Sequence, residues 1–335
     1  MIMELQFAIA GCGNIAPRHA ENIKKHGKLS AVCDIVPEKA NELAKLYTAN
    51  AYYSFDEMLE KEPAVSIVVI CTPNGLHAEH TIKALQDGRH VICEKPMCLS
   101  LPAAWSMRDT AHFFRRNLFV VKQNRFNPPV LAVKELLDEN KLGKITGVQV
   151  NGFWNRDKRY YTGGWKGTKE LDGGILFTQY SHFIDLVCWF FGAPFNFRSS
   201  KKNLLLQNIS ETEDNLVSIA ELPNGALCTF HFSLNSFGSN MEGSITVIGE
   251  KGTVKIGGQY LNVLEYQCVE GMERIQLNPA ANPNDYGFYQ GSMSNHDKVY
   301  ENIIQVLKGN SSKYTNAEDG LKTVEVIERM YASCQ

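Results

Sequence analysis

The sequence of 335 residues lacks several features that mark special classes of protein. No apolar run reaches the roughly 18 residues that a membrane-spanning helix needs, which excludes a transmembrane segment. No charge of one sign dominates, since the formal net charge is only -2, whereas a nucleic-acid-binding protein carries a basic stripe. Internal repeats and low-complexity segments are also absent. We therefore expect a globular protein with neither nucleic acid nor membrane among its partners.

Paired cysteines are absent as well. The nine cysteines stand singly, without any CxxC pair, and several lie inside strand-like apolar runs. Such cysteines are typical of small buried side chains in a reducing compartment rather than of disulfides. The segment that follows Met1 shows no charged region with a cleavage site after it, so we expect a cytoplasmic protein without a secretory signal.

Two sequence patterns divide the chain at about residue 123. Before this point, apolar strand-like runs alternate with amphipathic helical stretches, as in the strand Ser66 to Cys71 followed by the helix Leu76 to Gln86. This alternation predicts a parallel, doubly wound sheet of the Rossmann type. The length also allows two domains that each bury a core. We therefore predict an α/β protein with a dinucleotide-binding domain over residues 1–123.

Strand-like runs dominate the rest of the chain. Most show partial alternation of apolar and polar residues and are separated by turn signals such as Pro223-Asn224-Gly225. A strongly apolar helix, Ile175 to Phe191, interrupts them, and an amphipathic helix, Ala317 to Ala332, follows. The pattern predicts an α+β domain over residues 124–335 with a mostly antiparallel sheet. Its last helix could pack back on the first domain.

Glycines near the amino terminus form the most informative motif. The apolar strand Leu5 to Ala10 leads into GCGNIA, where Gly11 permits a tight turn and Gly13 lets a pyrophosphate approach the backbone. Asp34 ends the second strand about 20 residues later, where its carboxylate can accept hydrogen bonds from ribose hydroxyls. No arginine follows Asp34 closely, and a 2'-phosphate would be repelled by it. We predict NAD rather than NADP, with an ordinary tight turn as the alternative.

Lys95 follows the fifth predicted strand directly, between Glu94 and Pro96. Ligands of such sheets bind beyond the carboxyl ends of the strands, so Lys95 is expected beside the nicotinamide. An ammonium there can hydrogen-bond a substrate hydroxyl and stabilise charge as the alcohol becomes a ketone. The alternative is a solvated lysine paired with Glu94. Thr72 and Asn74 close the fourth strand and should line the same groove.

A polar stripe marks the predicted helix from Ile175 to Phe191. Thr178, His182 and Asp185 stand at i, i+4 and i+7 and share one face, while most other positions are apolar. Buried polar side chains need partners, which a catalytic cleft or satisfied core hydrogen bonds could supply equally. Since an unperturbed imidazole titrates near pH 6.5, His182 is the best candidate for a general base.

A loop from Trp154 to Lys169 gathers basic and aromatic residues. Arginines such as Arg156 and Arg159 can clamp a phosphate or carboxylate in a bidentate way, and tyrosines such as Tyr161 can stack on a sugar or base. The loop therefore suits an anionic, partly planar ligand, with an exposed charged loop as the alternative. Two further residues at the predicted domain junction are expected to reach the same cleft, namely Arg125 and Asn127.

The motif HAEH offers the one pair of histidines at a spacing that two metal ligands could use. His77 and His80 stand at i and i+3 on a predicted helix, but no third ligand follows at a recognisable spacing. His77 also follows a strand end, where contact with the cofactor is expected. We therefore predict no metal site.

Together these motifs resemble the glucose-fructose oxidoreductase and inositol dehydrogenase (Gfo/Idh/MocA) family. The resemblance runs nearly end to end, through GCGNIA, CTPNGLH, EKP, the pair Trp165-Lys166, and DGG followed by His182. It implies the two domains predicted above, an open second sheet that packs against another subunit, and catalysis by Lys95 and His182. A carboxylate usually precedes this histidine by four residues, but Thr178 stands there with Gln179 beside it. Lys95 and His182 would then have to share the transfer of the substrate proton.

Three segments resemble one branch of that family, which acts on UDP-linked N-acetylamino sugars and their uronic acids: QNRFNPPV, GGWKGTKELDGG and GSMSNHDKVYENII. This resemblance implies NAD-dependent oxidation of a sugar hydroxyl at C3 to a keto sugar, in surface polysaccharide biosynthesis. The alternatives are a dehydrogenase of a free sugar or inositol, an NAD-dependent glycosidase of the same fold, and a non-enzymatic dinucleotide sensor.

The residues expected to contact NAD are Gly11, Gly13, Asn14, Ile15, Asp34, Thr72, Asn74, His77, Glu94, Lys95, Gln123, Trp165 and Lys166. Those expected to contact the substrate are Arg125, Asn127, Arg156, Arg159, Tyr161, Thr178, Gln179 and His182.

Overall fold

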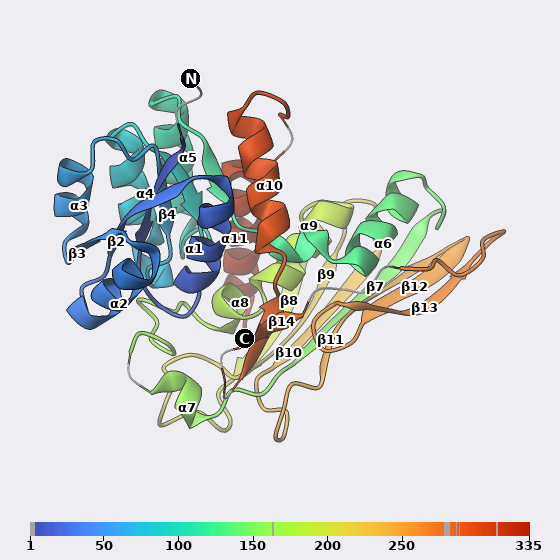
Figure 1. The fold of residues 1–335 in the computed structure, drawn as a ribbon. Helices are drawn as coiled ribbons and strands as arrows, with labels where there is room; N and C mark the ends of the chain where they lie inside the picture. The colour runs from blue at the N-terminus through green and yellow to red at the C-terminus, as the bar shows by residue number, and fades with distance from the viewer. Residues whose placement is uncertain (1–3, 163, 278–281, 286, 288, 313) are drawn as a thin grey trace. The chain divides into compact units, whose positions relative to one another are not determined.

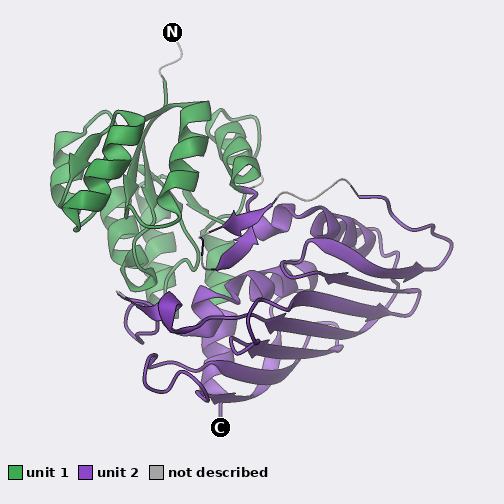
Figure 2. Cartoon of the chain, turned by 60° about the horizontal axis from the view of Figure 1, so that its bottom comes forward, with its two compact units in different colours: residues 1–121, 296–324 green, residues 122–295, 325–335 purple. Residues whose placement is uncertain are grey.

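The computed structural model describes residues 4–335 apart from 163, 278–281, 286, 288 and 313. The chain forms two compact units, coloured separately in Figure 2. Unit 1 comprises residues 1–121 and 296–324, and unit 2 comprises residues 122–295 and 325–335. The sequence places 296–324 with the second domain, but these residues belong to unit 1 because α10 (His296–Leu307) packs against α1 (Ala16–His26).

Unit 1 contains a six-stranded parallel sheet of order β3-β2-β1-β4-β5-β6, which confirms the predicted doubly wound sheet. Its strands are β1 (Gln6–Ala10), β2 (Lys28–Cys33), β3 (Asn50–Tyr52), β4 (Ile67–Ile70), β5 (His90–Cys93) and β6 (Leu118–Val120). The central strands read as continuous apolar runs because both of their faces are buried, as in the fully buried IVVI of β4.

Helices connect the strands of unit 1, as Figure 1 shows. The connecting helices are α1, α2 (Pro37–Tyr47), α3 (Phe55–Lys61), α4 (His77–Gln86), α5 (Leu101–Phe113) and the short 3-10 helix η1 (Asn74–Leu76), whereas α10 comes later in the chain. Local signals start several of them. Pro37 opens α2, and the Ser100 side chain accepts a hydrogen bond from the Ala103 N–H at the start of α5. Helix α11 (Ala317–Ala332) begins in unit 1 and ends in unit 2.

Unit 2 contains a seven-stranded sheet of order β13-β12-β11-β7-β10-β9-β8. Its strands are β7 (Ile145–Phe153), β8 (Phe195–Lys202), β9 (Asn215–Glu221), β10 (Leu227–Ser233), β11 (Glu242–Gly249), β12 (Gly252–Gly257) and β13 (Val263–Val269). Neighbouring strands are antiparallel except β7 and β10, which confirms the prediction of a mostly antiparallel sheet. Strand β8 was not predicted: it lies at the edge of the sheet, is largely exposed, and its apolar alternation stops after Phe197, where the polar run RSSKK begins.

Short elements and helices complete unit 2. They are η2 (Gln123–Phe126), α6 (Pro128–Asp138), α7 (Lys158–Tyr161), α8 (Ile175–Thr178), α9 (Ser181–Phe191), β14 (Pro283–Asp285) and β15 (Gln290–Met293). The sheet buries one face against aromatic residues of the α8–α9 segment. Tyr180 stacks on Phe232 of β10 with ring centroids 4.3 Å apart, and Phe183 contacts the same ring edge-on. Among the described residues, no helix has both the length and the apolar character required to cross a bilayer.

The single helix predicted from Ile175 to Phe191 is in fact two helices, α8 and α9, so that prediction is wrong at its centre. The break falls at Gln179 and Tyr180, where the Tyr180 ring packs on the sheet and its hydroxyl donates to the Ser233 carbonyl at 2.7 Å. Thr178 and His182 therefore do not belong to one continuous helix.

Candidate functional site

The glycine-rich loop after β1 fits a dinucleotide. Gly11 has a φ of +93°, and a Cβ there would lie 2.5 Å from the Cys71 carbonyl, so no other residue fits this turn. A Cβ at Gly13 would meet nothing within 4 Å, which leaves the backbone open to an approaching pyrophosphate. Asn14 and Ile15 lead into α1, whose first turn carries no acidic residue. The positive end of the helix dipole there favours an anion.

Asp34 lies just beyond the end of β2 and closes the same loop. Its Oδ2 accepts the Cys12 N–H at 2.8 Å, and its Oδ1 accepts the Val36 N–H at 2.8 Å. A carboxylate offers about four acceptor positions. Asp34 is half-buried, so it can hold the loop and still accept hydrogen bonds from ribose hydroxyls.

His77 joins the segments that follow β4 and β5. Its Nδ1 lies 2.7 Å from the Pro96 carbonyl oxygen and its Nε2 lies 2.8 Å from the Thr72 carbonyl oxygen. Burial lowers the pKa of His77, although both carbonyls act against that effect. Asn74 is also buried, whereas Lys95 is only half-buried and precedes Pro96 through a cis peptide bond.

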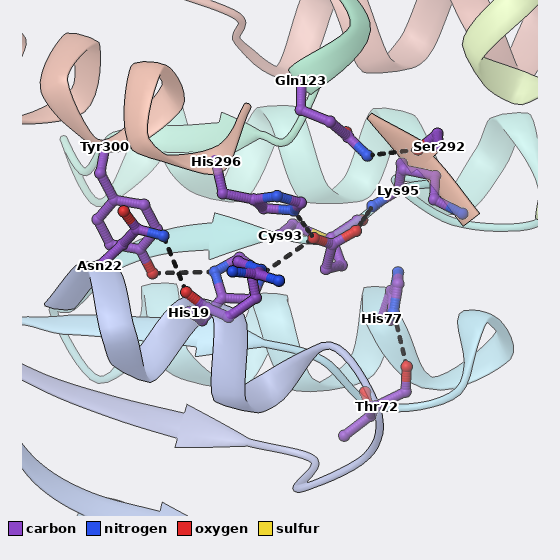
Figure 3. A network of polar contacts seen from close by, with 12 residues as sticks. His19, Asn22, Thr72, His77, Cys93, Lys95, Gln123, Ser292, His296 and Tyr300 are labelled. Carbon is purple, nitrogen blue, oxygen red and sulfur yellow. Dashed lines mark hydrogen bonds and ion pairs between the residues drawn. The ribbon is translucent and has the colours of Figure 1, made fainter. Parts of the chain in front are cut away.

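Glu94 follows β5 and belongs to a buried polar network, whose members His19, His296 and Tyr300 are labelled in Figure 3. Its Oε1 lies 2.9 Å from His19 Nε2 and 3.3 Å from His296 Nε2, and its Oε2 accepts the Lys95 N–H at 3.0 Å. The Tyr300 hydroxyl lies 2.9 Å from His19 Nδ1. His19, His296 and Tyr300 were not among the predicted site residues, yet His19 stands on the apolar face of an amphipathic helix, where a histidine requires a partner.

The same network contains the one group of three or more His, Cys, Asp or Glu side chains with metal-ligand spacing in the part of the chain that the structure describes. The ligating atoms of His19, Glu94 and His296 all lie within 4.8 Å of one another. The HAEH pair does not form such a group, since His80 Nδ1 lies 3.1 Å from the Thr72 hydroxyl while His77 contacts carbonyl oxygens.

His182 is 4% exposed at the start of α9, within unit 2. Its Nε2 lies 3.4 Å from the Ser292 hydroxyl, which also accepts a hydrogen bond from Gln123 Nε2 at 3.0 Å. The imidazole is therefore held by the β15 and η2 segments. Ser292 was not predicted as a site residue, although it lies in the segment GSMSNHDKVYENII that the family resemblance singled out.

Thr178 is linked to a second carboxyl group in unit 2. Its hydroxyl donates to the carboxylate of Asp172, whose Oδ2 also accepts the Gly167 N–H at 2.7 Å. Burial raises the pKa of Asp172, and the hydrogen bonds from Thr178 and Gly167 partly counter it. Asp172 was not predicted as a site residue, but it ties the loop that carries Trp165 and Lys166 to α8.

Cations and aromatic rings pack together in the predicted binding loop. The Arg156 guanidinium lies over Trp154, Tyr160 and Tyr289 with distances of 5.3, 5.3 and 4.9 Å to the ring centroids. Lys166 Nζ lies 3.8 Å from the centroid of Tyr160. Two of the predicted substrate residues join the same cluster, since Gln179 Nε2 donates to the Tyr160 hydroxyl at 3.1 Å and the Tyr161 ring packs edge-on against Tyr160.

Three other predicted substrate residues lie elsewhere. Arg125 makes a bidentate ion pair with Asp185, with both bonds at 2.8 Å and both side chains buried. Asn127 is fully buried and donates to the carbonyls of Tyr260 and Leu261. Arg159 is exposed and pairs with Asp157.

Comparisons with known proteins identify the family of the chain. Residues 5–120 match the oxidoreductase family's NAD-binding Rossmann fold, and residues 134–335 match the C-terminal alpha/beta domain of the same Gfo/Idh/MocA family. The chain is similar to the WlbA dehydrogenase of Bordetella pertussis, solved with NADH and UDP-GlcNAcA. The two are 30% identical, the match covers 99% of this chain and 96% of that one, and the TM-score is 0.89.

Two other similar proteins are named for different substrates. Glucose-6-phosphate 3-dehydrogenase of Bacillus subtilis is 26% identical over 97% of this chain and 95% of that protein. An inositol dehydrogenase homolog of Azotobacter vinelandii, complexed with NAD+, matches 99% of this chain and 96% of that one at 20% identity with a TM-score of 0.85, which shows the fold alone. The chain thus belongs to the Gfo/Idh/MocA family and is an NAD-dependent oxidoreductase of the sugar dehydrogenase type.

Proposed function

We propose that this enzyme oxidises the C3 hydroxyl of a UDP-linked N-acetylamino sugar, or of its uronic acid, to a ketone in surface polysaccharide biosynthesis. The observation that carries the proposal is the similarity to WlbA over nearly the whole length of both chains, because that enzyme was solved with UDP-GlcNAcA. A second WlbA dehydrogenase, also solved with NADH and UDP-GlcNAcA, is 31% identical over 99% of this chain.

The cluster around Arg156 supports an anionic and partly planar ligand. It offers the guanidinium of Arg156 and the ammonium of Lys166 beside the rings of Tyr160 and Tyr289. Cations suit the pyrophosphate and the uronate of such a substrate, and aromatic rings suit its base or sugar. Of the predicted substrate residues, we propose Arg156, Tyr161, Thr178 and Gln179 as those that line this part of the site.

In the proposed reaction, Lys95 and His182 act on one substrate hydroxyl. When bound, NAD would supply the acceptor for the hydride of the alcohol carbon. His182 removes the hydroxyl proton as general base, and the Lys95 ammonium hydrogen-bonds the oxygen and stabilises its developing charge. Gly11, Gly13 and Asp34 would hold the dinucleotide, as their geometry allows.

A sugar phosphate is the second candidate substrate. The similarity to glucose-6-phosphate 3-dehydrogenase covers 97% of this chain, and a phosphate group would meet the same cations of unit 2. Both candidates assign the reaction to an anionic sugar, but they differ in whether a nucleotide is attached.

A substrate panel tests the proposal. Purified enzyme is mixed with NAD and UDP-N-acetylglucosaminuronate, UDP-N-acetylglucosamine, glucose 6-phosphate or myo-inositol, and the absorbance of NADH is followed. In a separate recycling assay with a keto-acceptor added, the keto-sugar product is followed instead, because the acceptor reoxidises NADH. We expect turnover with a UDP-sugar. Turnover of glucose 6-phosphate alone favours the second candidate, and release of a glycoside leaving group without net NADH identifies a glycosidase instead.

We further propose self-association through the open face of the unit 2 sheet. The outward side chains of β9 and β10 include Val217, Ile219 and Leu227, which are 48%, 49% and 67% exposed. Apolar side chains gathered on the uncovered face of a sheet are typical of a subunit interface.

A further inference from the structure

The Glu94 carboxylate is the acceptor in the hydrogen bonds that surround it. Burial alone would raise the pKa of Glu94, but the hydrogen bonds from His19 and His296 outweigh it and hold the pKa well below its usual value. An ionised carboxylate can only accept, so both Nε2 atoms carry hydrogens. Burial also lowers the pKa of His19 and raises that of Tyr300. The 2.9 Å contact between the Tyr300 hydroxyl and His19 Nδ1 fits a neutral His19 that carries its hydrogen on Nε2 and accepts from Tyr300.

The backbone on both sides of Lys95 is anchored by buried imidazoles (Figure 3). On the amino-terminal side, the Glu94 carboxylate accepts the Lys95 N–H and is itself held by His19 and His296. On the carboxyl-terminal side, His77 contacts the Pro96 carbonyl oxygen at 2.7 Å. The side chains that make these contacts are almost fully buried. An ordinary surface turn has no such buried hydrogen-bond partners on both sides.

The donors come from distant parts of the chain. His19 lies on α1, directly after the glycine-rich loop, while His296 and Tyr300 lie one turn apart on α10. Glu94 and His296 are separated by 202 positions in the sequence. The segment that returns from unit 2 thus supplies two of the groups that hold the end of β5.

We propose that His19, His296 and Tyr300 are positioning residues, which hold the Glu94 carboxylate and through it the backbone of Lys95 in the geometry that the reaction needs. This inference rests on the catalytic role proposed above for Lys95. The rival interpretation is a metal ion held by His19, Glu94 and His296. It is disfavoured because both Nε2 atoms already lie at hydrogen-bond distance from Glu94 Oε1, at 2.9 and 3.3 Å, so the carboxylate is satisfied without an ion.

Variants at His296 and Tyr300 test the inference through turnover. In H296L we expect kcat to fall about tenfold to 100-fold with KM changed less than about twofold, because Lys95 is displaced while the binding groups remain. H296Q should regain most of kcat, since its amide N–H can donate to Glu94. Y300F should lower kcat, whereas Y314F, which removes a hydroxyl from a ring packed on Phe119, should not.

Unchanged kcat in H296L and Y300F, measured well below their melting temperatures, overturns the inference. The same holds if kcat falls only in proportion to the fraction of protein that remains folded.

A second measurement needs no sugar substrate, so it separates failure of this inference from failure of the proposed function. Long-range 1H–15N spectra of the histidines in the free protein should show His19 as the neutral Nε2–H tautomer between about pH 6 and 8, and Y300F should shift its Nδ1 signal. A His19 imidazolium or Nδ1–H tautomer overturns the inference. So does one tightly bound metal ion per chain in the wild-type protein that is missing from H296L.

Discussion

At the scale of single residues, Gly11 and Gly13 serve the same loop for different reasons. Gly11 has a left-handed backbone and lies against the Cys71 carbonyl, so the fold itself requires a glycine there. Gly13 faces open space, so only a ligand would require its small size. Gly11 is therefore needed for folding, and Gly13 is needed for cofactor binding.

We predict that Gly11→Ala destabilises the protein by about 1–3 kcal/mol through backbone strain. The clash of the new methyl group with the Cys71 carbonyl adds to this loss. Gly13→Ala should leave the free energy of unfolding nearly unchanged but weaken NADH binding, because its methyl group occupies the path of the pyrophosphate. Urea denaturation and fluorescence titration with NADH measure the two effects. Equal stability losses in both variants would contradict the prediction.

A second prediction at this scale concerns Lys95 and His182. Lys95→Met and His182→Gln should each lower kcat by about 100-fold to 10,000-fold, the usual range for losing a general acid or base, while NADH still binds. Lys45→Met and His112→Gln change exposed residues of the same types and are the matched controls. Steady-state kinetics on the substrate found in the panel provide the measurement. Full activity in both site variants would refute the catalytic roles proposed for Lys95 and His182.

At the scale of elements, a buried ion cluster joins η2 to α9. Asp185 of α9 pairs with Arg125 at 2.8 Å and with Lys122 Nζ at 3.0 Å, and Arg125 also lies over the Trp189 ring. Burial alone would raise the pKa of Asp185, but the two cations outweigh it and hold the pKa far below its usual value. The cluster fixes the helix that begins next to His182.

We predict that Asp185→Asn destabilises the protein by about 3–5 kcal/mol at neutral pH, because two cations lose their buried partner. Since the folded pKa of Asp185 lies below the unfolded value of about 3.9, its contribution is present above that pH and fades as the pH falls below it. The difference between wild type and variant should therefore shrink in acid.

Urea denaturation between about pH 3 and 7 measures this effect. Asp56→Asn breaks an exposed pair with Lys83 and should cost less than about 1 kcal/mol. A stability difference for the Asp185 variant that is independent of pH would refute the ionic explanation.

At the scale of the whole molecule, the uncovered face of the unit 2 sheet predicts an oligomer. Ile219→Lys combined with Leu227→Lys places two charges on neighbouring strands of that face and should lower the mass measured by light scattering. Leu46→Lys changes an equally exposed leucine of α2 in unit 1 and should leave the mass unchanged. A monomeric wild-type protein would contradict the proposed interface.

Much of the fold can be read from local sequence. The glycine spacing around Gly11, the proline that opens α2 and the alternating strands β9 and β10 each act within a short stretch of chain, where backbone preferences and side-chain periodicity operate. Edge strand β8 and the break at Tyr180 could not be predicted, because each depends on residues far along the chain that pack against it.

The candidate site divides in the same way. The sequence by itself determined the NAD-binding loop, the place of Lys95 at a strand end and the family, because these depend on spacing along one segment. Only the tertiary structure decided that Glu94 is held by His19 and His296, and that Arg125 pairs with Asp185. The physical reason is that a buried charge needs partners from whichever elements pack around it, and that packing is set by the fold as a whole.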